Sequence, residues 1–86
     1  MSEEIIEKIY AETESEWEGD NAFQGLQIIA KYIDPTKNDI IQGADHDVIY
    51  SVDGQDLLDA GITKKDLKAL FKLNWSYEDS SFKCFV

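Results

Sequence analysis

The spacing of the large apolar residues changes along this chain, and the change limits the folds that it can adopt. Apolar side chains near the N-terminus recur three to four residues apart, as they do on one face of a helix. Farther along, β-branched and aromatic residues are concentrated in short runs, as they are in strands. Neither kind of element can bury its apolar side alone, so we predict an α+β fold in which helices pack on a sheet.

The helical pattern occurs in three segments and one shorter turn. Asp20 or Asn21 is a suitable N-cap for the second helix, and Asp34, which precedes Pro35, ends it. Gly61 suits the left-handed position that follows the short turn. The predicted helices are residues 3–10, residues 22–33 and a helix opened by Thr63, with the turn running through Leu57 and Leu58.

Two residues in these helices lead to further predictions, one about capping and one about helix stability. Asp66 stands three residues after Thr63, which predicts a reduced form of the capping box. Gly25 lies inside the second helix, where a glycine weakens the helix relative to alanine. We therefore expect Gly25 to be a local weakness.

The strand pattern predicts a small antiparallel sheet. Residues 47–52 read as a strand, and residues 74–77 and 82–86 read as a C-terminal hairpin around the polar turn 78–81. We predict two or three helices on about three strands, in a single domain of residues 1–86. Most aromatic residues of so small a domain must be core, with Trp17 the candidate for exposure.

The charge balance restricts the partners. The chain has 18 acidic residues against eight basic ones, all lysine, for a net charge of −10. Such a charge repels DNA, RNA and anionic lipid, because binding a polyanion requires neutralising its phosphates. A basic protein surface, including one that holds nucleic acid, is attracted instead.

The charge is also uneven along the chain. Residues 1–20 hold eight acids and one lysine, whereas residues 61–86 hold five lysines and three acids. Lys64, Lys68 and Lys72 fall on one helical face, which we read as solvated. The sequence thus predicts an acidic front and a mildly basic back.

The acidic run at residues 12–20 is the main candidate for partner binding. Two interpretations of residues 11–20 stay open: the first helix continues to Trp17, or the stretch forms an extended acidic arm. In an extended arm, carboxylates two residues apart would project about 6.7 Å apart, comparable to phosphates along a nucleic-acid backbone. The plainer alternative is a solvated face that maintains solubility. The candidate residues are Glu12, Glu14, Glu16, Trp17, Glu18 and Asp20, joined by Asp53, Asp56 and Asp59.

Two further places have chemically active side chains. His46, the one histidine, stands between Asp45 and Asp47, and imidazole with carboxylate can ligate a metal or move a proton. A metal site needs further ligands, and the sequence contains no HExxH motif, second histidine or cysteine pair. Cys84 lies in a predicted strand, where a buried thiol is the ordinary outcome. We expect no cofactor, no metal and no enzyme activity.

Targeting features favour the cytoplasm. No apolar run approaches the roughly 20 residues that a membrane helix needs. The first four residues provide neither the basic nor the apolar part of a secretory signal. One cysteine, Cys84, cannot form an internal disulfide, which fits a reducing compartment. We expect a cytoplasmic protein.

The second half of the chain resembles a family of small phage and mobile-element proteins of unknown function. The resemblance covers about residues 22–86 and leaves out the acidic run. Asn74 stands where the family pattern usually has glycine. The pattern is carried by His46-Asp-Val-Ile-Tyr50, by Asp66-Leu-Lys-Ala-Leu-Phe-Lys-Leu-Asn-Trp75, by an acidic turn and by Phe82-Lys-Cys-Phe-Val86.

A phage-borne acidic protein of this size is similar in kind to anti-CRISPR and anti-restriction inhibitors. The resemblance implies a protein that places carboxylates where a host complex expects phosphates. Our leading hypothesis is therefore a non-enzymatic inhibitor that binds the basic surface of a host protein or nucleoprotein complex, without direct contact to nucleic acid or membrane. The alternatives are a self-associating structural or regulatory protein, such as a homodimer, and a metal-dependent enzyme at Asp45, His46 and Asp47.

Overall fold

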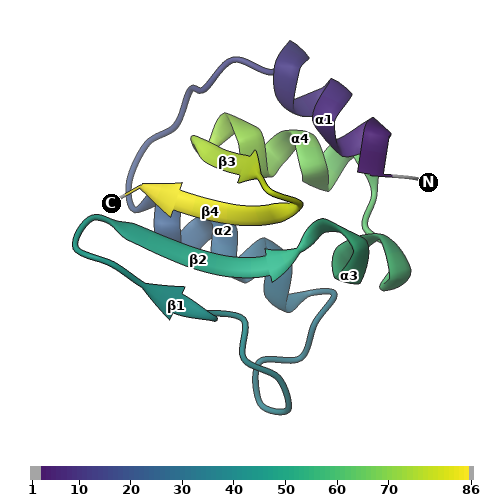
Figure 1. Ribbon diagram of the computed structural model, residues 1–86. Coiled ribbons are helices and arrows are strands. Elements are labelled where there is room, and N and C mark those ends of the chain that lie inside the picture. Colours follow the sequence, from purple (N-terminus) through teal and green to yellow (C-terminus); the bar gives the residue numbers. More distant parts are fainter. Residues whose placement is uncertain (1–2, 86) are drawn as a thin grey trace.

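The computed structural model describes residues 3–85, which form four helices and one four-stranded antiparallel sheet (Figure 1). The predicted α+β class and C-terminal hairpin are confirmed. The helices are α1 (Glu3–Glu12), α2 (Asn21–Ala30), α3 (Gly54–Asp59) and α4 (Lys64–Lys72). The strands are β1 (Gly43–Ala44), β2 (Val48–Asp53), β3 (Trp75–Glu78) and β4 (Ser81–Phe85); Val86, the last residue of the predicted hairpin, lies outside the described residues.

The predicted helix boundaries are largely confirmed by the caps. The Asp20 carboxylate accepts a hydrogen bond from the Phe23 N–H at 3.0 Å, and the Thr63 hydroxyl accepts one from the Asp66 N–H at 3.1 Å. Gly61 has a φ of 89°, the left-handed value expected after the turn that is now α3. Asn74 has a φ of 65°, so this position after α4 suits asparagine or glycine.

Three expectations about the helices are corrected. Helix α2 ends at Ala30, before residue 33, because the N–H groups of Lys31 and Tyr32 bond to carbonyls three residues back and tighten the turn. Helix α1 ends at Glu12, so it does not continue to Trp17. The Asp66 carboxylate does not complete a capping box, because it accepts hydrogen bonds from the side chains of Tyr32 and Lys31.

The sheet has the order β1-β2-β4-β3, with every neighbouring pair antiparallel. The β3–β4 turn consists of Asp79 and Ser80, whose φ values of 52° and 64° match a tight hairpin turn. Strand β4 then pairs on its other edge with β2, some 30 residues earlier in the chain. The short strand β1, which the sequence pattern missed, extends this sheet beside β2.

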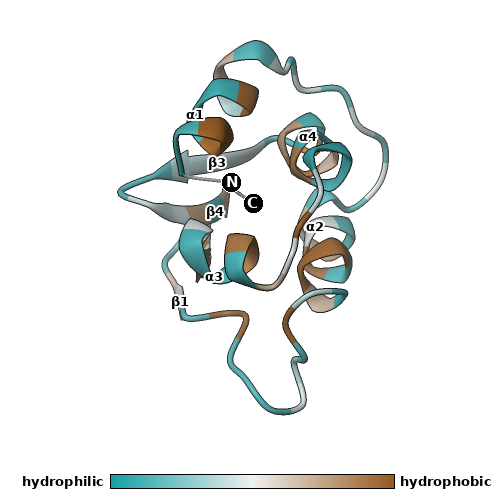
Figure 2. Cartoon of the chain, turned by 90° about the vertical axis from the view of Figure 1, so that its right-hand side faces the viewer, coloured by the Kyte–Doolittle hydropathy of each residue, from teal (hydrophilic) through white to brown (hydrophobic). Residues whose placement is uncertain are grey.

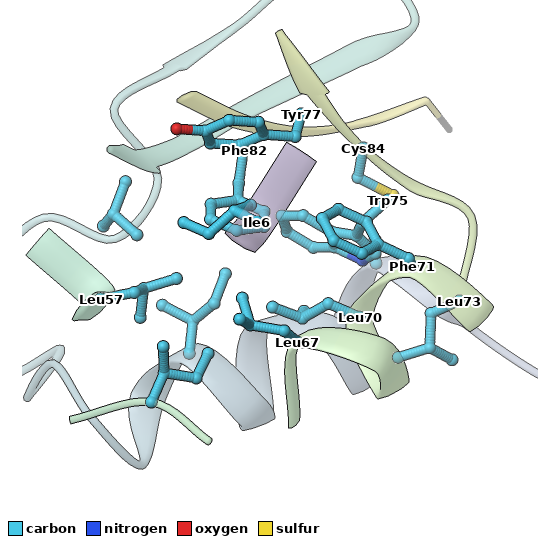
Figure 3. Packing of buried hydrophobic residues seen from close by; sticks show 14 residues of the cluster. Ile6, Leu57, Leu67, Leu70, Phe71, Leu73, Trp75, Tyr77, Phe82 and Cys84 are labelled. Carbon is cyan, nitrogen blue, oxygen red and sulfur yellow. The ribbon is translucent and has the colours of Figure 1, made fainter. Parts of the chain in front are cut away.

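The core lies between the sheet and the helices (Figures 2 and 3). Figure 2 shows α2 and α4 on one side of the strands. On the inner face of the hairpin, Trp75 pairs with Cys84 and Tyr77 with Phe82, and all four side chains are buried. The largest fully buried side chains are Trp75, Phe71, Phe82, Ile6, Ile29, Leu57, Ile62, Leu67 and Leu70.

Gly25 has a packing role that the sequence did not indicate. A Cβ atom at this position would lie 2.1 Å from the Trp75 Nε1 atom. The indole N–H is itself fixed, since it donates to the Asn21 carbonyl at 3.0 Å. Gly25 therefore lets the largest core side chain lie directly against α2. The glycine that was expected to weaken the helix is required for the packing of Trp75.

Among the residues that the structure describes, none of the helices has both the length and the apolar character to cross a bilayer.

Candidate partner-binding surface

The acidic segment, defined as residues 12–20, is an irregular strip that is bonded to the C-terminus of α4. The Glu16 N–H donates to the Lys72 carbonyl at 2.8 Å. The Ser15 hydroxyl donates to Asn74 Oδ1 at 3.0 Å. The last carbonyls of a helix lack partners within the helix, so the segment supplies one that α4 needs. Residues 13–20 are thus not a continuation of α1, and they belong to no strand of the sheet.

The carboxylates of this segment face solvent. All five acids are exposed. The two ion pairs formed within residues 3–85 are Lys31–Asp66 and Lys83–Glu78, and neither involves the segment. Asp20 has a local structural role as the N-cap of α2. The other four acids, whose positions are fixed through the backbone, are Glu12, Glu14, Glu16 and Glu18.

The lysines of α4 lie beside this segment, which corrects the expected acidic front and basic back. Glu12 lines a hollow of about 240 Å³ together with Lys64 and Lys68. Glu16 lines a larger groove together with Lys72. The packing of α1 on α4 causes this arrangement, because it brings the N-terminal acids to the helix that carries most of the C-terminal lysines.

The second group of predicted acids does not join the first. Asp53 accepts a hydrogen bond from the Ser81 hydroxyl at 2.7 Å, and Asp59 accepts one from the Gln55 amide at 2.8 Å. Asp56 and Asp59 line a hollow of about 790 Å³ on the loop that follows α2. In Figure 1 the acidic segment runs down the left of the molecule, whereas α3 lies at the right. The two groups of acids therefore lie apart on the molecule.

The groove next to the acidic segment combines apolar and charged walls. We call it the Trp17 groove; it has a volume of about 700 Å³. The Trp17 side chain is 42% exposed, as expected for the one aromatic residue on the segment. Sequence spacing could not reveal the groove, because three separate segments form it. Its lining residues are Glu16, Trp17, Glu18, Gln24, Gln27, Ile28, Lys31, Ala69, Lys72 and Leu73.

Asp66 holds one edge of this groove in place. Its carboxylate accepts a hydrogen bond from the Tyr32 hydroxyl and lies 3.0 Å from the Lys31 ammonium. The Tyr32 hydrogen bond, followed by the Lys31 contact, lowers the pKa of Asp66. The same carboxylate raises the pKa of Lys31. The Lys31 charge at the groove is therefore already balanced by an acid of α4.

The structure gathers no metal ligands around the histidine. Asp45, His46 and Asp47 form the exposed β1–β2 turn, where Asp45 Oδ1 accepts the His46 N–H at 2.9 Å. Within residues 3–85 no three His, Cys, Asp or Glu side chains come close enough to hold an ion. The turn therefore offers no third ligand from the described part of the chain.

Cys84 is a buried residue of the sheet, as predicted. Its side chain is fully enclosed, with the Asn21 amide 3.5 Å from the sulfur atom. Burial raises the pKa of the thiol, and the nearby Asp20 charge adds to the effect. This environment disfavours the thiolate, the form that acts as a nucleophile.

Trp17 is not the only exposed aromatic residue among those described, because two others lie on the outer face of the sheet. Trp75, Tyr77 and Phe82 are buried, but Phe85 is 46% exposed, because its place in β4 directs it away from the helices. Tyr50 on the neighbouring strand β2 is exposed as well. Alternation within a strand indicates two faces, but only the tertiary structure shows which face the helices cover.

Comparisons with known proteins identify no relative of this chain. No protein-family model matches the chain, and neither a curated protein nor a solved structure shows a significant match.

Proposed function

We propose that this protein is a non-enzymatic inhibitor that uses its acidic segment to bind the basic, nucleic-acid-holding surface of a protein complex in the bacterial cytosol. The observation that supports this proposal is the state of the carboxylates in residues 12–18. They are exposed, they take part in neither described ion pair, and backbone contacts to α4 hold the strip that carries them.

The electrostatics favour a basic partner. The net charge of −10 attracts a positive surface over several ångströms and speeds the encounter. The exposed carboxylates would lose hydration at the interface, and their attraction to the lysines or arginines of a partner would offset that cost. A basic surface that normally holds phosphates would then be occupied, so nucleic acid could no longer bind there.

The fixed backbone of the acidic segment reduces the cost of binding. A disordered acidic tail must be ordered when it binds, and this ordering subtracts from the affinity. Here the Glu16 N–H and the Ser15 hydroxyl already connect the strip to α4. The acidic segment is therefore a better candidate contact than a solvated tail of the same composition would be.

We propose a defence complex of the host as the target, because residues 22–86 resemble phage and mobile-element proteins. Asp53 ends β2 and Asp56 and Asp59 lie in α3, apart from the acidic segment, so we assign the contact to that segment and not to these three acids.

The test compares two variants that each neutralise five acids. The first replaces Glu12, Glu14, Glu16 and Glu18 by glutamine and Asp20 by asparagine, which can still cap α2. The matched control replaces Asp45, Asp47, Asp53, Asp56 and Asp59 by asparagine. Each tagged protein is used to capture complexes from nuclease-treated bacterial lysate, with elution by increasing salt and identification by mass spectrometry.

The proposal predicts that wild type and the control capture a nucleic-acid-handling complex that elutes as salt rises. It also predicts that the first variant captures at least tenfold less. The purified complex must then lose binding of its nucleic acid when wild-type protein is added. Equal capture by both variants, or a complex that still binds nucleic acid at saturation, would contradict the proposal.

Self-association is the second candidate, and the adjacency of acids and lysines favours it. A surface with a negative strip beside a positive one can match its own copy across a two-fold axis. In that case Glu16 of one copy would meet Lys72 of the other, and the reverse. Light scattering at low salt would show a dimer, and Lys72→Glu would dissociate it, whereas a monomer at all concentrations would remove this candidate.

A further inference from the structure

We infer that the Trp17 groove binds an arginine side chain of the partner, in preference to lysine. The inference rests on the proposed function and refines it, since it identifies the residue type that the acidic segment recognises. The observations that carry it are the exposed indole and the two glutamates and apolar residues that line the same groove.

The walls of the groove suit a guanidinium group. Trp17 is flanked in sequence by Glu16 and Glu18, and all three line the groove. A guanidinium is planar, stacks on an indole face and can donate two parallel hydrogen bonds to one carboxylate. A lysine ammonium is more strongly hydrated and lacks the planar fork, so it gains less from the same walls.

The apolar lining of the groove suits the remainder of the arginine side chain. Ile28, Ala69 and Leu73 supply apolar surface from α2, α4 and the end of α4. Arginine carries three methylene groups before its charged end, and such stems pack on apolar surface while the charge stays near water. Glutamates on a wholly polar surface would attract lysine and arginine more equally.

Two lysines of the groove have different effects on a cationic ligand. The Lys31 ammonium is paired with Asp66 at 3.0 Å, so its repulsion of the ligand is largely balanced. Lys72 is exposed at the C-terminal end of α4, and neither described ion pair includes it. Its positive charge opposes an incoming guanidinium, and removing it is expected to strengthen binding.

The experiment uses two capped peptides, hexa-arginine and hexa-lysine, titrated into the full ¹⁵N-labelled chain. The two indole N–H signals report separately: Trp17 is exposed, whereas the buried Trp75 indole is bonded to the Asn21 carbonyl and serves as an internal control of the fold. We expect hexa-arginine to shift the Trp17 signal and to bind about two- to fivefold more tightly than hexa-lysine, the range that one exposed cation–π contact provides.

Four variants sharpen this test. Trp17→Leu keeps the net charge and should abolish the preference for arginine while both peptides still bind. Glu18→Gln should reduce the preference, whereas Glu14→Gln, which removes the same charge outside the groove, should weaken both peptides equally. Lys72→Ala should tighten the binding of both.

The failures of the two proposals are distinguishable. If both peptides bind equally, or if Trp17→Leu keeps the preference, the arginine inference is wrong. The proposed function survives that outcome as long as neutralising the acidic segment still weakens both peptides and the capture of the complex. If neutralising the segment changes neither, the proposed function is wrong and the inference falls with it.

Discussion

The hairpin core and the acidic segment are held in place by different means. Trp75 and Phe82 are almost completely buried between the sheet and the helices, so apolar contact fixes them. The acidic segment buries none of its acids and is positioned by polar contacts with the end of α4. Substitutions in the core should therefore change stability, whereas those in the segment should change binding and leave the fold intact.

The largest effect should come from Gly25→Ala. Helix propensity alone predicts a gain of about 0.5–1 kcal/mol from this change. The structure predicts a loss of about 3 kcal/mol, because the new Cβ would lie 2.1 Å from the Trp75 ring nitrogen in a packed core.

Urea denaturation measures the sign directly. Gln27→Ala, at an exposed position of the same helix, serves as the control and should change stability by less than about 0.5 kcal/mol. A more stable Gly25→Ala protein would show that Trp75 is not held against α2.

The next effect should come from Asp66→Asn, which tests the polar contact between α2 and α4. We expect a loss of about 1–2 kcal/mol at neutral pH, because the charged acceptor of the Tyr32 and Lys31 bonds is removed. The folded pKa of Asp66 lies below its ordinary value of 3.8, so this contribution is present above that value. It is lost as the pH falls through the lowered pKa.

The free-energy difference between wild type and Asp66→Asn should therefore be constant from pH 7 down to about pH 5 and shrink below about pH 4. Chemical denaturation at several pH values gives this profile. Asp39→Asn, an exposed carboxyl, is the control. A difference that grows on acidification would mean that the carboxylate is not stabilised in the folded state.

A smaller effect is expected at the boundary between the two regions. The Asn21 amide donates to the Leu73 carbonyl at 2.8 Å, beyond the last turn of α4. Asn21→Ala should cost about 1 kcal/mol, because that carbonyl loses its partner. Thermal unfolding can compare it with Asn38→Ala, which removes a bond within an exposed loop. Equal melting temperatures for the two variants would argue against a role of Asn21 in joining α2 to α4.

The smallest effect on stability should come from the acidic segment itself. Replacing Glu14, Glu16 and Glu18 by glutamine leaves the backbone bond from Glu16 to Lys72 in place, so stability should change by less than about 0.5 kcal/mol. Capture of the partner should nevertheless fall strongly. A loss of more than about 1 kcal/mol would show that these carboxylates serve the fold, and the contrast between the two regions would disappear.

The sequence predicted those parts of the site that depend on near neighbours. The exposure of residues 12–20 and of Trp17 follows from their composition, and the Asp20 cap follows from residue type. The groove could not be predicted, because Ile28 and Leu73 are brought to Trp17 only when α2 and α4 pack together. The lysines of α4 were placed on the wrong side for the same reason.

Helix caps, turn residues and the three longer strands were determined by the sequence alone, because each depends on side chains within about four positions of one another. Asp20, Thr63 and Gly61 are examples, and the structure confirms each. Only the tertiary structure decided that β4 pairs with β2, that Trp75 packs against Gly25 and that the acidic segment lies against the end of α4. These contacts join residues about 30 to 60 positions apart, and their free energy comes from burial and hydrogen bonds that no local pattern encodes.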